Sequence, residues 1–341
     1  MRKDVKSMIL IWLVCLFTLS ACGYIHDDLP PCPGEGLSLA FRYDYNLQRA
    51  DMFPDHVGSV TVYLLDEEGY LVGKQTESGE ALKACGYRMH WDIEPGKYQY
   101  VAIAGQKPFE AMWQTGGAKF RLTEPVLGDS ISALSLVLDH QENGMVPHAN
   151  LPLDTLWHGM QLQPVEIVAG KQTVDTVSLM RNTKQISLLF NSLDNDVTDI
   201  ADFDIKITDR NARLLWNNQV DESETVMYTP YVTWNTKDFA HAELMMPRLL
   251  YHGSDQQQKD AILSVVHKQS GKEVVRINLP DMLAQLRTSA EVYRYQPQEF
   301  LDRGYDFRLT FFLKGDAWAY VNIEIATLSW TKRIQYEDFQ L

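Results

Sequence analysis

The chain has 341 residues, with 45 acidic side chains against 31 basic ones and a formal net charge of −14. Its basic residues form no patch along the sequence, so we expect no nucleic-acid partner. The length is sufficient for two domains, each able to bury its own apolar core.

The N-terminus has the pattern of a bacterial lipoprotein signal peptide. Three basic side chains within the first six residues precede an apolar run over 8–19, which is shorter than the roughly 20 residues that a membrane-spanning helix needs. Leu19-Ser20-Ala21-Cys22 matches a lipobox, so residues 1–21 are predicted to be removed and Cys22 to be acylated. The alternative is an ordinary signal peptide that contains a cysteine by chance. Acyl chains on Cys22 would hold the mature chain on a membrane without a spanning segment.

Export also bears on the remaining cysteines. Cys15 leaves with the signal peptide and Cys22 takes the lipid, which leaves Cys32 and Cys85. In an oxidising compartment this pair could form one disulfide. Two separate buried thiols are the other interpretation, since the sequence does not show whether the two Cα atoms approach to about 6 Å.

The mature chain begins with a tether and continues as strands. Residues 22–36 are rich in Pro and Gly and predict an extended tether. Large apolar or aromatic residues then alternate with small or charged ones over 37–45, as in a half-buried strand. A second β-rich run, 59–65, is followed by the turn Asp66-Glu67-Glu68-Gly69 and a return strand. The Pro95-Gly96 turn leads into an alternating strand that ends at Gly105, an arrangement common in transthyretin-like sandwiches.

Short strand patterns fill most of the remaining chain. Two short helices are predicted, at 280–288 and 298–302, before two long strands at 305–313 and 318–330. A break near 180–184 divides the strands into two groups, so we predict an N-terminal domain over 37–182 and a C-terminal domain over 183–341. The predicted fold class is all-β, with two β-sandwich domains in tandem. The other predicted strands are 131–138, 164–168, 174–179, 185–190, 203–208, 213–216, 242–246, 262–267 and 273–279.

The sequence contains no motif that assigns an enzymatic reaction. HExxH, CxxC, GxSxG, the Walker A loop and GxGxxG are all absent. Trp157-His158-Gly159 is interpreted as a strand-end histidine and a turn glycine rather than a catalytic group. The carboxylates between Asp194 and Asp204 do not follow the EF-hand spacing, so a solvated loop is favoured over a Ca²⁺ site. We therefore predict no catalytic residue, metal, cofactor or small-molecule substrate.

The tryptophans support a second hypothesis. Trp113, Trp157, Trp216, Trp234, Trp318 and Trp330 could stack on sugars, although aromatic residues occur more often in sandwich cores. The chain would then be a surface glycan-binding lipoprotein of a nutrient-uptake system. A surface hydrolase is a third hypothesis, for which no site is nominated.

Several segments resemble one family in its own order along the chain. The segments are 22–46, 50–57, 60–66, 156–159, 179–186, 298–303 and 309–313. Taken together they are similar to Bacteroidales fimbrial anchor subunits, the FimB-type fimbrillin-associated family.

The resemblance implies a fold and a role. It implies two transthyretin-like β-sandwich domains in an outer-membrane lipoprotein that sits at the base of a fimbria, holds stalk subunits and limits the length of the stalk. Stalk subunits of this class assemble by strand exchange, a form of β-augmentation. Asp27 and Asp28, close to the predicted acylated Cys22, resemble a surface-export signal. The alternative is that they only make the tether soluble. We expect the chain on the outer face of the outer membrane, because an anchor must meet an extracellular stalk.

One departure from the stalk subunits matters. A protease removes an N-terminal strand from such subunits after Arg or Lys. Residues 23–41 contain neither, and the first basic residue is Arg42. We therefore expect this chain to keep its first strand and its lipid.

Overall fold

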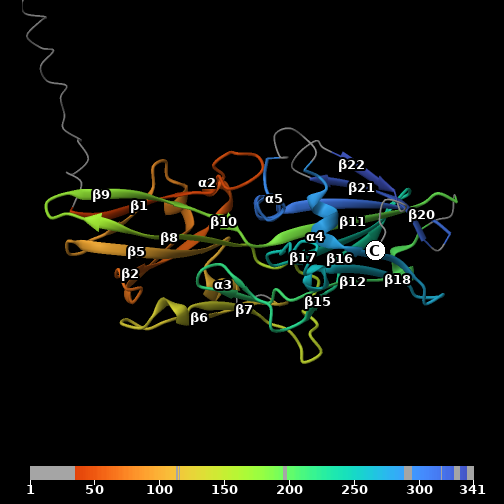
Figure 1. Ribbon diagram of the computed structural model, residues 1–341, viewed down its shortest axis with the longest axis horizontal. Coiled ribbons are helices and arrows are strands. Elements are labelled where there is room, and N and C mark those ends of the chain that lie inside the picture. The colour runs from red at the N-terminus through yellow and green to blue at the C-terminus, as the bar shows by residue number, and fades with distance from the viewer. Residues whose placement is uncertain are drawn as a thin grey trace, which may run out of the picture.

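The computed structural model describes residues 35–112, 114, 116–194, 198–287, 294–315 and 317–325, together with the backbone of 331–335. Two β-sandwiches lie end to end along the long axis of the molecule (Figure 1). The prediction of an all-β fold with two transthyretin-like sandwiches and short helices is confirmed. The described residues contain no helix that is long and apolar enough to cross a membrane. Cys22 and Cys32 lie outside the described residues.

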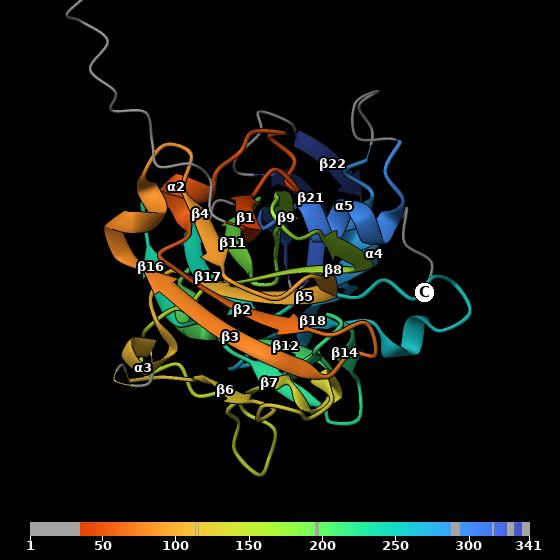
Figure 2. The same ribbon diagram turned by 90° about the vertical axis from the view of Figure 1, so that its left-hand side faces the viewer.

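The N-terminal sandwich is built from β1 (Gly36–Arg42), β2 (Ser59–Leu65), β3 (Leu71–Ser78), β4 (Arg88–Trp91), β5 (Gly96–Gly105), β8 (Leu156–Ile167), β9 (Gln172–Ser178) and β10 (Met180–Arg181), with α2 (Phe53–His56) and η2 (Gly79–Lys83) in the connections. A three-stranded sheet, β4-β1-β9, faces a five-stranded sheet, β10-β8-β5-β2-β3. β1 is the middle strand of the smaller sheet, antiparallel to β4 and parallel to β9. Figure 2 looks onto this end of the molecule.

β1 forms where the alternation predicts a strand, but it is not half-buried as expected, because Ser38 on its other side is buried as well. Leu37 and Leu39 have no exposed surface and belong to the core of this sandwich. Gly36 starts the strand at φ +105°, where a Cβ would lie 2.2 Å from the carbonyl oxygen of Trp91. Only glycine fits this position without strain, because it tolerates positive φ and has no Cβ.

The five-stranded sheet is covered on both faces. All seven residues of β2 are buried. Val60 and Val62 lie in the core shared with β1, whereas Tyr63 and Leu65 belong to a second core on the opposite face. That face is covered by the segment containing α3 (Phe109–Met112), β6 (Phe120–Thr123), η3 (Ile131–Ala133) and β7 (Ser135–Leu138).

The C-terminal sandwich pairs a six-stranded sheet, ordered β16-β17-β11-β20-β21-β22, with a four-stranded sheet, ordered β15-β12-β18-β19. β11 and β20 run parallel in the middle of the larger sheet. The elements are β11 (Lys184–Ser192), η4 (Ile200–Asp202), β12 (Phe203–Asp209), β15 (Val226–Tyr228), β16 (Val232–Asn235), β17 (Ala240–Met246), η5 (Gln257–Lys259), β18 (Ile262–His267), β19 (Glu273–Asn278), α4 (Leu279–Ala284), α5 (Pro297–Arg303), β20 (Asp306–Lys314), β21 (Ala317–Ile325) and β22 (Thr331–Gln335).

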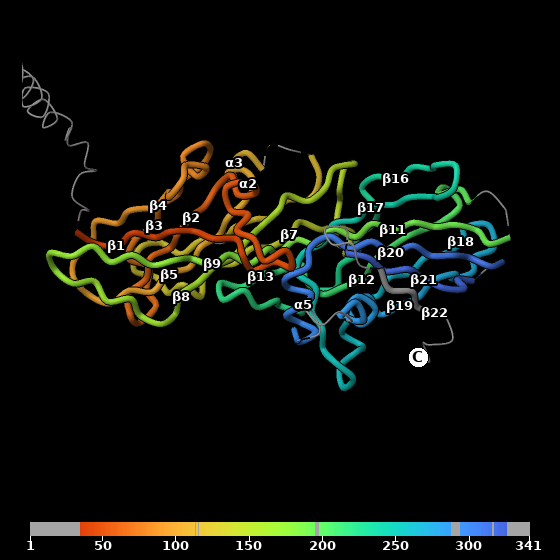
Figure 3. Tube along the Cα trace, turned by 90° about the horizontal axis from the view of Figure 1, so that it is seen from above, coloured from red at the N-terminus to blue at the C-terminus, as the bar shows by residue number. Residues whose placement is uncertain are grey.

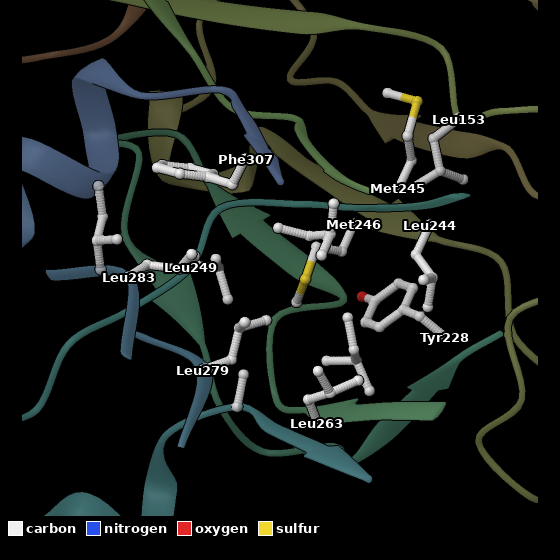
Figure 4. Packing of buried hydrophobic residues seen from close by; sticks show 14 of the residues in the cluster. Leu153, Tyr228, Leu244, Met245, Met246, Leu249, Leu263, Leu279, Leu283 and Phe307 are labelled. Carbon is white, nitrogen blue, oxygen red and sulfur yellow. The ribbon is translucent and has the colours of Figure 1, made fainter. Parts of the chain in front are cut away.

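Apolar side chains from both sheets fill this sandwich. In Figure 4, Leu244 and Met246 of β17 lie close to Leu263 and Tyr228 of the opposite sheet. Farther along the sandwich, the ring of Phe190 stacks on those of Phe203 and Phe311, with 5.6 Å between centroids in each pair.

A fifth sheet draws strands from both halves of the chain. β13 (Arg213–Leu215) and β14 (Val220–Asp221) join β7 and β6 in the order β14-β13-β7-β6. The amide of Leu138 donates to the carbonyl of Ala212 at 2.8 Å, and that of Val146 to Met227 at 2.9 Å. The second core of the N-terminal half and the core of the C-terminal sandwich form one continuous cluster. In the other four sheets, every strand comes either from before residue 183 or from after residue 182. That 37–182 and 183–341 are separate domains stays a prediction.

The structure alters some local predictions. The strand predicted over 131–138 forms only at its end, because Ile131–Ala133 is a turn of 3₁₀-helix capped by Ser130. The helices predicted at 280–288 and 298–302 are Leu279–Ala284 and Pro297–Arg303. The sequence analysis missed β16 entirely.

The aromatic stack gives a direct test of the core. Phe311→Ala should lower the free energy of unfolding by about 3–5 kcal/mol, because it removes a fully buried ring from a packed cluster. Leu127→Ala, at a position that is 70% exposed, should change it by less than about 0.5 kcal/mol. Urea denaturation measures both, and equal losses would show that Phe311 is not part of the core.

Candidate functional site: the junction between the sandwiches

The two sandwiches are joined by a strand crossing and not by a free linker. β10 ends at Arg181, which pairs with Trp157 of β8, and β11 begins at Lys184. Asn182 and Thr183, the two residues between these strands, are both buried. The chain therefore passes directly from a sheet of one sandwich into a sheet of the other.

Lys184 attaches this crossing to α5. Its Nζ donates to the carbonyl oxygens of Asp302 and Gly304, at 2.9 and 2.7 Å. The side chain has no exposed surface, and burial lowers the pKa of Lys184 to about 7. Backbone carbonyls satisfy this amine, as a polar group with no access to water requires.

An ion pair extends the network into the C-terminal sandwich. Arg248 donates from Nε and Nη2 to the two carboxylate oxygens of Asp302, at 2.8 and 2.7 Å. Its Nη1 donates to the carbonyl of Asn218 at 2.6 Å. The side-chain amide of Asn182 donates to Oδ1 of Asn218 at 2.7 Å. Buried polar groups thereby connect the crossing segment with the turn between β13 and β14 and with α5.

Cation–π contacts connect α5 and its C-terminal end to the N-terminal sandwich. The guanidinium of Arg303 lies 4.0 Å from the ring centroid of Tyr45. That of Arg181 lies 4.2 Å from the centroid of Tyr305. Such contacts are worth about 2 kcal/mol when they are desolvated, and both join residues more than 120 positions apart in the sequence.

His158 belongs to this junction and not to a catalytic site. It is buried in β8, and its Nε2–H donates across the junction to the carbonyl of Trp216 at 2.8 Å. Burial lowers the pKa of His158 to about 4, so the imidazole is neutral near pH 7. Gly159 lies within β8 and not in a turn, which corrects the interpretation from sequence. A Cβ there would lie 2.7 Å from the side chain of Val177.

The acidic loop acts as a set of local caps. Asp199 accepts from the amide of Ala201 at 2.9 Å and from the side chain of Asn235 at 2.7 Å. Asp194 accepts from the amide of Gly315 at 2.6 Å. The described part of the chain contains no group of three or more His, Cys, Asp or Glu side chains arranged to hold a metal ion.

The tryptophans differ in exposure. Trp157 is fully buried, and Trp216 is partly buried against the continuous core. Trp234 on β16 is the exception at 40% exposed. Trp318 is buried, while Trp113 and Trp330 lie outside the described residues. Trp157 and Trp318 therefore cannot form part of a sugar-binding surface in this structure.

Cys85 lies in the exposed turn before β4, next to Tyr87, whose ring stacks on Phe41 near the end of β1. The chain from Cys32 enters β1 at its other end, Gly36. β1 is roughly 20 Å long, and the connection from Cys32 to Gly36 spans at most about 14 Å. A disulfide requires Cα atoms within about 7 Å, so the bond needs a nearly extended connection. The pairing of Cys32 with Cys85 stays a prediction.

The junction ion pair should contribute strongly to stability. Arg248→Met should lower the free energy of unfolding by about 3–5 kcal/mol, because it leaves the buried carboxylate of Asp302 without its bidentate partner. Arg276→Met is the matched control, since its ion pair with Glu273 is exposed and should be worth less than about 1 kcal/mol. Similar losses in urea denaturation would contradict the role of Arg248.

A buried carboxyl predicts a pH dependence. Burial raises the pKa of Asp209 to about 7, above that of the unfolded chain. The folded state therefore retains a proton that the unfolded state loses between about pH 4 and 7, and stability falls as pH rises through this window. Relative to the parent, the free energy of unfolding of Asp209→Asn should rise between pH 4 and 8, by on the order of 2–4 kcal/mol over this range. Asp255→Asn, on an exposed loop, should show no such gain in parallel urea titrations.

Comparison with known proteins agrees with this architecture. The family model of fimbrillin-A associated anchor proteins Mfa1 and Mfa2 matches residues 29–336. The structure is similar to that of a candidate polysaccharide-binding protein from Bacteroides thetaiotaomicron, with 29% identity, a TM-score of 0.75, and coverage of 90% of this chain and 100% of the other. A candidate adhesin from the same species has 28% identity and a TM-score of 0.72, with the same coverage.

A more distant structure shares the fold. The fimbrial anchor protein Mfa2 from Porphyromonas gingivalis has 16% identity and a TM-score of 0.63, with coverage of 87% of this chain and 98% of the other. No curated protein matches the chain. Because the family model covers most of the sequence, the chain belongs to the family of fimbrillin-A associated anchor proteins.

Proposed function

We propose that this chain is a non-enzymatic outer-membrane lipoprotein that anchors a fimbria at its base and limits its length. Cys22 carries the acyl chains on the outer face of the outer membrane, and the two sandwiches transmit force from the lipid to the fimbrial stalk subunits. Family membership supports a fimbrial role. The observation that carries the anchoring role is the position of β1.

β1 is placed to receive a pulling force. The predicted tether enters it at Gly36, at the end of the molecule farthest from the C-terminal sandwich (Figure 1). β1 is paired along its full length with β9, from Gly36↔Gln172 to Arg42↔Ser178, and is also paired with β4. A pull along β1 loads all these hydrogen bonds together in shear, and they do not open one at a time.

The force then has a direct covalent route. β9 continues through Leu179 into β10, and β10 continues through the buried crossing into β11. β11 lies in the middle of the six-stranded sheet, between β17 and β20. The hydrogen bond from His158 to Trp216, the two cation–π contacts at α5 and the shared fifth sheet hold the sandwiches against each other. Tension therefore does not have to be carried by one peptide segment alone.

Retention of β1 is part of this proposal. Leu37 and Leu39 are completely buried, whereas Arg42, the first basic residue after the tether, is exposed at the end of the strand. Cleavage at Arg42 would release the strand that receives the force. We therefore propose that the mature anchor keeps residues 22–42, and mature protein on cells that lacks them would contradict this.

Lipidation gives the central test. In a strain expressing Cys22→Ala, fimbriae should appear in the medium or detach as long polymers, because the base has lost its membrane attachment. Electron microscopy and immunoblotting of cells and medium measure the distribution. Cys85→Ala is the matched control and should leave fimbriae on the cells. Attachment that is unchanged by Cys22→Ala would refute the anchoring role.

Glycan binding is retained as a second candidate because Trp234 is exposed and a similar structure belongs to a candidate polysaccharide-binding protein. The burial of Trp157 and Trp318 counts against an extended sugar platform. Quenching of tryptophan fluorescence by surface polysaccharide in the parent, and its loss in Trp234→Ala, would favour this candidate.

A further inference from the structure

β16 is an edge strand that has no protecting residue of its own, and η4 contacts it only at its Asn235 end. It is the outer strand of the six-stranded sheet, and all four of its residues are exposed. Its sequence, Val232-Thr233-Trp234-Asn235, contains no charge and no proline. Soluble proteins normally protect such edges with charged residues, proline or covering segments.

The other edge strands of the described sheets do carry such protection. β15 is uncharged, but it is bridged to Met145 through Met227. Each remaining edge strand contains at least one charged residue: Arg88 in β4, Asp175 in β9, Lys74 in β3, Arg181 in β10, Glu273 in β19, Asp221 in β14, Arg121 in β6 and Lys332 in β22. The lack of protection is therefore specific to β16.

One face of the Trp234 ring faces the position that an additional strand would occupy. Trp234 is directly opposite His241 on β17. The two rings are 4.7 Å apart and within 10° of parallel, and this separation equals the spacing of about 4.7–4.9 Å between neighbouring strands. The rings therefore stack along the hydrogen-bonding direction. One face of Trp234 contacts His241, and the other faces outward over the free edge.

The backbone of β16 offers hydrogen-bonding groups in the same direction. The amide of Thr236 donates to the carbonyl of Phe239 at 2.8 Å. In an antiparallel pair, successive residues alternate between bonding the partner and pointing away from it. Trp234 therefore directs its backbone groups toward β17, whereas Thr233 and Asn235 direct theirs outward. The side chain of Asn235 is held by Asp199, which fixes this end of the strand.

Aromatic contacts continue from this edge across the sheet. Phe239 lies 6.2 Å from His241 and 6.5 Å from Phe312, measured between ring centroids. Phe312 in turn stacks on Tyr320 at 4.4 Å. In Figure 3, β16 lies along one side of the C-terminal sandwich, away from the start of β1. The open edge is thus in the half of the molecule that is remote from the proposed membrane attachment.

We propose that β16 receives an extended segment of the fimbrial subunit held by the anchor, which adds a seventh strand to the six-stranded sheet. This inference rests on the proposed function and assigns the surface through which it operates. Backbone bonds to Thr233 and Asn235 provide the pairing, as in β-augmentation. A planar side chain of the added strand, aromatic, His or Arg, stacks on the outward face of Trp234 as His241 stacks on its inner face.

A strand suits this edge better than a glycan. Sugar rings stack on aromatic rings whose broad faces lie open to solvent as a platform. The outward face of Trp234 is also open to solvent, but it lies beside the outward-pointing backbone donors and acceptors of Thr233 and Asn235. These are the features that a strand satisfies and a sugar does not require.

Two substitutions on β16 test the inference. The probe is fimbriae sheared from cells that lack this chain, and the full mature chain is immobilised in a binding assay. Thr233→Pro should weaken binding at least tenfold, because proline removes an outward donor and is tolerated where an edge N–H faces solvent. Trp234→Ala should also weaken binding at least tenfold, whereas Trp234→Tyr should restore most of it by retaining a planar ring.

Thr76→Pro on β3 is the matched control, because β3 is also an edge strand and lies in the other sandwich. It should leave binding within about twofold of the parent. Thermal unfolding of each variant checks the fold. A photo-reactive phenylalanine derivative at position 233 should cross-link to a fimbrial subunit, and mass spectrometry should locate the cross-link in an extended segment.

Several outcomes would overturn the inference. If Thr233→Pro and Trp234→Ala bind fimbriae as the parent does, β16 is not the docking edge. If the parent dimerises and Thr233→Pro is monomeric, with fimbrial binding unchanged, the edge belongs to a second copy of the chain. If surface polysaccharide binds the parent and Thr233→Pro but not Trp234→Ala, the edge is a sugar site. The release of fimbriae from cells that express Cys22→Ala is measured separately. The anchoring role can therefore be supported even if β16 proves not to be the docking edge.

Discussion

The architecture depends on the direct passage of the chain from β10 of the first sandwich into β11 of the second. Asn182 and Thr183 are buried between β10 and β11, so the crossing has no room to act as a flexible linker. Burial of this segment favours partners within the protein for its polar groups, and several have them, whereas Oδ1 of Asn182 and Oγ1 of Thr183 have no hydrogen-bond partner among the described residues. Backbone carbonyls accept hydrogen bonds from the amine of Lys184, and Oδ1 of Asn218 accepts one from the side-chain amide of Asn182. These hydrogen bonds in turn fix the positions of α5 and of the turn between β13 and β14.

Rigidity at the junction comes from apolar packing as well as from polar contacts. The five-stranded sheet is covered on both faces, and the core on its outer face continues without a break into the C-terminal sandwich. β7 and β13 complete this connection by pairing across the junction. The molecule therefore has two sandwich topologies but one connected hydrophobic interior. Bending at the junction would expose apolar surface at a cost of about 25 cal/mol per Å². It would also break the hydrogen bond from His158 to Trp216 and separate the guanidinium of Arg303 from the ring of Tyr45.

The sequence predicts those features that depend on neighbouring residues. The alternation over 37–45 predicts β1, and the Pro95-Gly96 turn predicts the start of β5, because side-chain period and turn chemistry are local. The junction network could not be predicted, since Lys184, Arg248 and Asp302 are separated by more than 50 residues from one another. The pairing of β7 with β13 is equally non-local.

β16 was missed because its alternation of apolar and polar residues covers only four positions, the shortest run that indicates a strand, and because Trp234 was weighed only as a sugar platform or a core residue. The unusual feature of this strand appears only when sheet order shows which strands have an open side.

The proposed retention of the first strand and the proposed docking edge on β16 are complementary. In a sandwich whose first strand has been removed, a partner strand can fill the vacated position in the sheet. Here β1 occupies that position between β4 and β9, with Leu37 and Leu39 fully buried, so an incoming strand has no vacancy in the N-terminal sandwich. Strand addition must then take place at an outer edge, and an edge without charge, proline or cover is the physical requirement for it. An anchor of the proposed kind, attached to the membrane through β1 and paired with a subunit at one edge, would begin a polymer without itself being extended from both ends.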